Sequence, residues 1–207
     1  MNNNYRKKAL ITVTVFCMAV SSITACGGKD KAAEDTSGSE ISETKDSSTE
    51  NSGEEKQAKV DGLNYTSVDG KIQITLPGES WKNIADTDNA KTFQSDEGTI
   101  NITYASGDGI GDLMVPADQD AFVSMINGGM ADTPFDVMNY ENLSSGDTRC
   151  YKAVLHYTKD GNPDKYGVYY GIYEGDEGYT AAAIITKDDK TLLKTVEESV
   201  YGFQILK

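Results

Sequence analysis

The chain has 207 residues, and its 33 acidic residues against 19 Lys and Arg residues give a formal net charge of −14. Such a charge repels nucleic acid and anionic lipid headgroups, so the composition argues against both as partners. Cations and basic protein surfaces remain open as partners, and a simpler interpretation is that the acidity keeps an exported domain soluble.

Residues 1–25 have the pattern of a bacterial lipoprotein signal peptide. Three basic residues at positions 6–8 precede an apolar run at 9–20, which is too short to span a bilayer as a helix. Residues 23–26 read Ile-Thr-Ala-Cys, a lipobox, so we expect Cys26 to be lipidated and to anchor the mature protein in the bilayer. The alternative is an ordinary secretory signal with a chance cysteine. The predicted location is the outer face of the cytoplasmic membrane, in a Gram-positive type of cell.

The next segment is predicted to be a tether. Residues 27–58 hold nine acidic residues, four lysines and one large apolar side chain, Ile41. They cannot bury enough apolar surface to offset the entropy of ordering, so we expect residues 26–58 to be the lipidated cysteine and a disordered acidic tether. Residues 59–207 have the size of one domain and carry 24 acidic and 12 basic residues.

The folded part is predicted to open with strands. Residues 71–76 alternate polar and apolar side chains, the pattern of a strand with one buried face. A short strand is expected at 91–94, and an acidic turn joins it to a second alternating run at 99–104, so these two form a hairpin. The glycine-rich stretch 106–112 is expected to be a flexible loop.

A helix and four further strands are expected next. Apolar side chains at helical spacing follow Pro116 and stop at a Gly-Gly pair, which predicts a helix: Ala121, Phe122, Met125 and Ile126. Four strand-like runs then follow, separated by short turn-rich gaps: 135–143, 149–158, 165–174 and 179–186. Short gaps favour antiparallel neighbours and therefore a meander.

The last predicted element is a helix at residues 188–201, with an apolar stripe from Leu192 to Val200 and Gly202 as its stop. The order of strands and helices predicts an α+β fold. Its centre is one antiparallel sheet, and helices flank that sheet.

The domain resembles the PsbP-like family, in the broad sense that includes the nuclear-transport Mog proteins and many small bacterial lipoproteins. The resemblance rests on residues 70–81, an opening strand followed by a proline and a tryptophan, and on the closing helix followed by Gly-Phe-Gln-Ile at 202–205. It implies a central antiparallel sheet sandwiched by helices, and a non-catalytic binding or assembly role. It implies no catalytic residue, cofactor or metal site for this sequence.

Motifs that would carry chemistry are incomplete. Gly107, Gly109 and Gly111 are spaced as G-x-G-x-G, which is not the dinucleotide-binding pattern. Residues 160–164 begin like a calcium loop but continue without its glycine and glutamate, so a hairpin turn is the better interpretation and weak calcium binding stays open. Cys150 and His156, six residues apart on one strand, are too distant for proton transfer. We therefore predict no catalytic residues, no cofactor and no metal.

Tyrosines give the best remaining indication of a ligand site. In residues 166–173 one strand face carries Tyr169 and Tyr173 beside two glycines. These rings would form a shallow platform for a glycan or peptide if they are exposed. The alternative is that they fill space beneath a helix.

Two functional hypotheses follow from the sequence. The first is a lipid-anchored binding or accessory protein that engages an unknown protein or cell-wall partner. The second is a surface enzyme such as a carboxylate-dependent glycan hydrolase, which requires two carboxylates facing each other across a cleft, about 5–9.5 Å apart.

Overall fold

The computed structural model describes residues 58–129 and 133–206. The predicted signal peptide, Cys26 and the acidic tether lie outside the described residues. The described strands are β1 Lys59–Asp61, β2 Asn64–Thr66, β3 Ile72–Thr75, β4 Lys82–Asp86, β5 Ala90–Ser95, β6 Gly98–Ser106, β7 Phe135–Asn142, β8 Thr148–Tyr157, β9 Tyr166–Glu174, β10 Glu177–Ile185 and β11 Gln204–Ile205. The described helices are α1 Ile110–Met114, α2 Gln119–Gly129 and α3 Lys190–Tyr201. None of these helices is long and apolar enough to cross a membrane.

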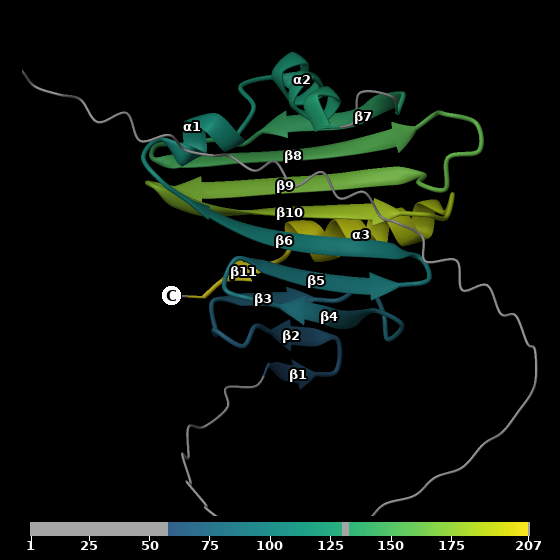
Figure 1. Ribbon diagram of the computed structural model, residues 1–207, viewed down its shortest axis with the longest axis horizontal. Coiled ribbons are helices and arrows are strands. Elements are labelled where there is room, and N and C mark those ends of the chain that lie inside the picture. Colours follow the sequence, from purple (N-terminus) through teal and green to yellow (C-terminus); the bar gives the residue numbers. More distant parts are fainter. Residues whose placement is uncertain (1–57, 130–132, 207) are drawn as a thin grey trace, which may run out of the picture. The chain divides into compact units, whose positions relative to one another are not determined.

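The strands form two antiparallel sheets (Figure 1). The larger sheet has the order β4-β5-β6-β10-β9-β8-β7, and the smaller has the order β1-β2-β3-β11. Neighbours β7, β8, β9 and β10 follow one another in the chain, so the predicted meander is confirmed. Strand β10 closes the large sheet by pairing with β6 along its whole length, from Glu177 opposite Ser106 to Ile185 opposite Gly98. The predicted α+β fold, an antiparallel sheet flanked by helices, is confirmed.

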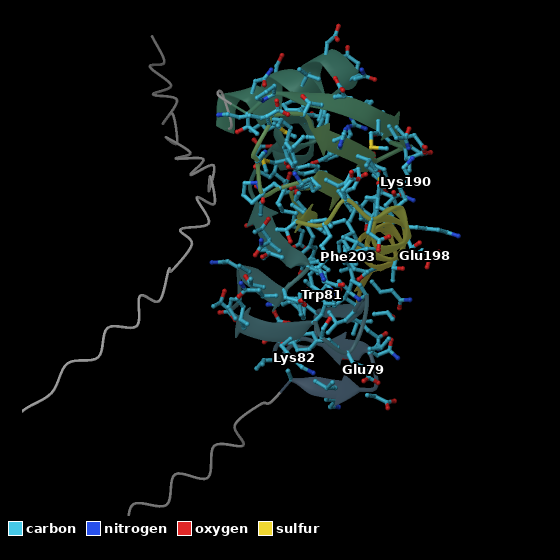
Figure 2. The ribbon with its side chains drawn as sticks, turned by 90° about the vertical axis from the view of Figure 1, so that its right-hand side faces the viewer. Glu79, Trp81, Lys82, Lys190, Glu198 and Phe203 are labelled. Atoms are coloured by element: carbon cyan, nitrogen blue, oxygen red, sulfur yellow. The ribbon has the colours of Figure 1, made fainter. Side chains whose placement is uncertain are left out.

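One face of the large sheet is covered by α3 and by strands of the small sheet. Leu193, Val196 and Val200 of α3 are buried against an aliphatic core that also holds Trp81 and Phe203. Figure 2 shows these two rings in the layer between α3 and the strands. Helix α3 starts at Lys190, two residues after the predicted bound, because the carboxylate of Asp189 accepts hydrogen bonds from two backbone N–H groups of the first turn. We call this the aliphatic core.

The opposite face is covered only in part. Helices α1 and α2 lie over the β7–β8–β9 half of the sheet, whereas the β5–β6 half carries no described helix on this side (Figure 1). Phe122 of α2 is fully buried, and its ring centroid lies 5.6–5.9 Å from those of Tyr140, Tyr151 and Tyr169. We call this the aromatic core. It is built mainly from the tyrosines of neighbouring strands.

A buried ionic cluster joins the small sheet to the large one. The Lys91 side chain is 2% exposed, and its Nζ lies 2.9 Å from Asp69 Oδ2 and 3.3 Å from Asp86 Oδ1. The Tyr65 hydroxyl donates a 2.5 Å hydrogen bond to Asp86 Oδ2, and burial, followed by this carboxylate partner, raises the pKa of Tyr65. Because β2 and the turn before β3 supply Tyr65 and Asp69, the cluster fixes the small sheet to the β4–β5 hairpin.

The structure corrects the predicted flexible loop at 106–112. Helix α1 begins at Ile110, whose side chain is buried, and the backbone N–H of Gly107 donates to the carbonyl of Asp176. A methyl at Gly111 would lie 3.3 Å from Tyr173 Cβ, so the glycine permits close packing on β9. The stretch is tied down by the sheet, and Gly111 is the glycine of the three that this contact requires. Strands β1, β2, β4 and β11, with two to five residues each, were not predicted.

Candidate functional site

The structure places Tyr169 and Tyr173 inside the aromatic core. Their exposed fractions are 9% and 1%, and both pack beneath α1 and α2. The Tyr169 hydroxyl lies 3.1 Å from that of Tyr157, and the Tyr173 hydroxyl lies 2.6 Å from Thr180 Oγ1. The prediction of an exposed tyrosine platform is therefore wrong: the rings fill space beneath the helices, which was the alternative.

The glycines beside these tyrosines do not leave the rings open. A methyl on Gly171 would lie 2.4 Å from the ring of Tyr151, which sits directly across the strand pair, and one on Gly167 would lie 2.8 Å from Tyr169. Each glycine is thus covered by an aromatic ring. The Gly-Tyr alternation allows several large rings to lie side by side on one sheet face.

Cys150 and His156 point to the aliphatic side of β8 and do not form a dyad. His156 stacks on Tyr166 with ring centroids 5.2 Å apart, while Cys150 lies six residues away, about 20 Å along an extended strand. The thiol is buried, and burial raises the pKa of Cys150. A protonated, buried thiol is typical of a cysteine that serves as a small core residue.

The turn at residues 160–164 is held by its own hydrogen bonds. The backbone N–H of Asp164 donates to Asn162 Oδ1, and Lys165 Nζ donates to the carbonyl of Asn162. The first of these contacts engages the Asn162 side-chain oxygen, which is the third-position ligand in a calcium loop. In the described part of the chain, no group of three or more His, Cys, Asp and Glu side chains is arranged to hold a metal.

A solvent-open depression of about 510 Å³ lies at one end of the large sheet. It is lined by carboxylates from three separate turns, together with one arginine: Asp108, Asp112, Asp147, Glu174, Asp176 and Arg149. Arg149 Nε donates to Asp112 Oδ1 at 3.0 Å, and its Nη1 donates to the carbonyl of Gly146. Both partners of this ion pair are well exposed, so the pair contributes little stability.

Topology explains how these carboxylates come together. In an antiparallel meander alternate turns lie at the same end of the sheet, so the turn before β8 and the turn after β9 are neighbours. The segment after β6 reaches the same end because β6 pairs with β10. The sequence showed acidic turns one at a time. The position of Asp108 and Asp112 beside the other acids depends on the β6–β10 pairing, for which the sequence carries no local signal.

The depression has the electrostatic character of a cation-attracting surface. Five carboxylates face one guanidinium, within a domain that is itself strongly acidic. Such a field raises the local concentration of cationic groups and repels phosphate or other anions. This agrees with the mismatch of the Gly107 to Gly111 spacing to a phosphate loop.

No family model matches the chain, and no curated protein matches it. Among solved structures, cyanobacterial PsbP (CyanoP) from Synechocystis sp. PCC 6803 aligns with 77% of this chain and 98% of its own, at 12% identity and a TM-score of 0.52. The Ran-binding protein Mog1p of Saccharomyces cerevisiae aligns with 72% of this chain and 95% of its own, at 8% identity and a TM-score of 0.44. The similarity to CyanoP extends over nearly all of that protein, and the described domain therefore has a PsbP-like fold.

Proposed function

We propose that this protein is a lipid-anchored, extracytoplasmic binding or accessory protein that acts without a catalytic site. The observation that carries the proposal is the lipobox ending at Cys26, which an acidic segment separates from the PsbP-like domain. A diacylglycerol on Cys26 holds the chain at the membrane, and 32 mostly polar residues lie between that anchor and the domain. Such an arrangement suits capture of a partner at or beyond the membrane surface.

Two features of the fold support a binding role, namely the packing of its potentially catalytic side chains and the character of its surface. Both sides of the large sheet hold packed side chains, and the groups that most often perform catalysis, Cys150 and His156, take part in that packing. The features left at the surface are an acidic depression and a polar sheet face. Surfaces of this kind recognise partners through charge and hydrogen bonding.

Replacement of Cys26 by Ala tests the anchor. The variant has no thiol to lipidate, so the domain should move from the membrane fraction to the soluble extracytoplasmic fraction, while Cys150→Ala should leave fractionation unchanged. Membrane association of Cys26→Ala that survives a high-salt wash would contradict lipid anchoring. Chemical crosslinking on intact cells, with Cys26→Ala as the control, should then capture a partner that depends on the anchor.

The acidic depression is the one observation that favours the alternative, a carboxylate-dependent glycan hydrolase. It gathers several carboxylates in one concave surface, as a pair of catalytic acids requires. If hydrolysis occurs there, Asp112→Asn and Glu174→Gln should each abolish release of sugar from cell-wall preparations by purified protein. Under the binding proposal, purified wild-type protein releases none.

A further inference from the structure

Within residues 58–129 and 133–206, the large sheet has an area on the side of α1 and α2 that no helix or strand covers. Partly exposed side chains from four adjacent strands make up this area, which we call the threonine face: Ala85, Ala90, Thr92, Gln94, Thr99, Asn101, Thr103, Thr180 and Ala182. They lie in cross-strand rows, such as Ala85, Thr92, Asn101 and Ala182. Figure 1 shows the front of β5 and β6 without a helix, and α3 behind the sheet.

The threonine face has no charged side chain among its nine residues. A quarter of the chain is charged, and the surface around the face follows that composition, with Asp96 and Glu97 at one end of the β5–β6 hairpin. Lys82 at the margin of β4 is the only charged residue in register with these rows. The face is therefore a neutral area on a strongly acidic domain. An uncharged ligand can approach it without electrostatic cost, whereas an anion is repelled by the surrounding field.

Hydrogen bonds within the face hold its side chains in place. Thr92 Oγ1 donates to Asn101 Oδ1 at 2.9 Å, and Thr103 Oγ1 donates to the carbonyl of Thr180 at 3.3 Å. The bond from Thr92 fixes the orientation of the Asn101 amide group, so that its oxygen faces Thr92 and its NH₂ group points away from Thr92. β-Branched threonines have few rotamers, so this array of hydroxyls and amides is largely preorganised.

The size of the face limits what can occupy it. Four strands about 4.8 Å apart and three rows of side chains give an area about 15 Å on each side, on the order of 200–300 Å². A second copy of the chain would need about 800 Å² on each partner for a stable interface. Peptide helices and apolar peptides need apolar grooves, whereas this face offers hydroxyls, amides and alanines, with one large apolar side chain, Ile184, where it borders the aromatic core. A short uncharged polyol with a regular repeat fits the area and its chemistry.

We propose that the threonine face binds a neutral glycan chain. Sugar hydroxyls supply both donors and acceptors to threonine and asparagine, and a pyranose in an extended glycan advances the chain by a distance close to the strand spacing of about 4.8 Å. Successive sugars can thus lie over successive strands. The inference rests on the proposed binding function and specifies its ligand class.

The test uses the full chain and two soluble probes. The first probe is an uncharged N-acetylglucosamine tetramer, and the second is a galacturonic acid tetramer of the same length. In an NMR titration at millimolar ligand, the neutral tetramer should shift backbone and side-chain amide signals of Asn101, Gln94 and Thr92, and the acidic tetramer should shift none. Absence of shifts with the neutral probe, or shifts confined to the acidic depression, overturns the inference.

A matched pair of variants locates the site. Thr92→Val with Thr103→Val removes two hydroxyls from the face while retaining β-branched side chains, which suit strands. Thr191→Val with Thr195→Val removes two hydroxyls from α3. The first pair should weaken binding of the neutral tetramer at least tenfold, and the second should leave it unchanged. Equal effects of the two pairs overturn the assignment. Anchor-dependent crosslinking on cells is independent of these results, so a failure here does not decide the broader function.

Discussion

The two cores of the domain face opposite sides of one sheet and are built from different side chains. Aliphatic side chains make up most of the core under α3, where six of the 19 buried residues are aromatic, whereas five of the ten buried residues under α1 and α2 are Tyr or Phe. The aliphatic core is covered by a regular amphipathic helix and a second sheet. The aromatic core is covered by a five-residue helix and an eleven-residue helix. Large rings compensate for this thinner cover, because each one buries more area than an aliphatic side chain.

The difference between the cores is also electrostatic. On the α3 side, Lys91 is buried together with two carboxylates. On the aromatic side, the buried polar atoms are neutral hydroxyls that bond to one another, as between Tyr157 and Tyr169. One side of the sheet should therefore be sensitive to removal of a charge or to acid, and the other to changes of shape. The predictions below test this contrast.

The largest expected effect is on the aromatic core. Tyr169→Ala with Tyr173→Ala should destabilise the domain by several kcal/mol, about 3–5 for each buried ring, as measured by thermal or urea unfolding. The exposed control Ile84→Ala should change stability by less than about 0.5 kcal/mol. A near-normal melting temperature in the double variant would contradict the burial of these rings. If the double variant does not fold, Tyr169→Phe still tests the core and should cost about 1 kcal/mol for the lost hydroxyl pair.

A similar loss is expected when the ionic cluster is broken. Lys91→Met leaves Asp69 and Asp86 without their cation and should cost about 3–5 kcal/mol in the free energy of unfolding. Lys187→Met removes a lysine whose ion pairs are exposed and screened by solvent, and it should leave the free energy of unfolding nearly unchanged. Equal effects of the two substitutions would show that the cluster does not hold the sheets together.

A smaller effect is expected from a single methyl group in the aromatic core. Gly171→Ala places its Cβ 2.4 Å from the Tyr151 ring, so the ring must move, at a cost of about 1–3 kcal/mol. Gly128→Ala in α2 meets open space and should be neutral or stabilising by up to about 1 kcal/mol. Urea unfolding of the two variants separates these outcomes. Stabilisation by Gly171→Ala would mean that the glycine is not covered by the ring.

The aliphatic core could be predicted from the sequence because its signals are periodic. The alternation at 99–104 and the helical stripe of α3 each indicate one buried face without reference to the rest of the chain. The resemblance of residues 70–81 to the PsbP-like opening strand was likewise confirmed by the fold. Short strands such as β1 and β11 were missed because two or three residues carry too little periodicity.

The aromatic core could not be assigned from the sequence for a physical reason. A tyrosine has an apolar ring and a polar hydroxyl, so the same strand pattern fits an exposed platform or a buried layer. The choice depends on whether a helix covers that face, and α1 lies in a glycine-rich stretch that has no helical period. The acidic depression and the threonine face could not be predicted from the sequence either, because each includes residues that only the pairing of β6 with β10 brings together.

The smallest predicted effect is a response to acid on the aliphatic side alone. Burial by itself would raise the pKa of Asp69, but hydrogen bonds from Ser67, the backbone of Lys71 and the Lys91 ammonium lower it to about 2. Since the folded-state pKa lies below the unfolded value of about 3.8, the stabilisation is present above pH 4 and is lost as the pH falls through 2. The loss should be about 1–2 kcal/mol.

Asp69→Asn isolates this contribution, because the difference in unfolding free energy between the variant and the wild type should shrink between pH 4 and pH 2. Trp81, the only tryptophan, lies in the aliphatic core, and Tyr169 and Tyr173 lie in the aromatic core. Acid should therefore change Trp81 fluorescence before it changes the NMR amide signals of Tyr169 and Tyr173. Simultaneous changes of both signals would show that the two cores respond to acid as one cooperative unit, in which case the ionic cluster stabilises the aromatic side as much as its own.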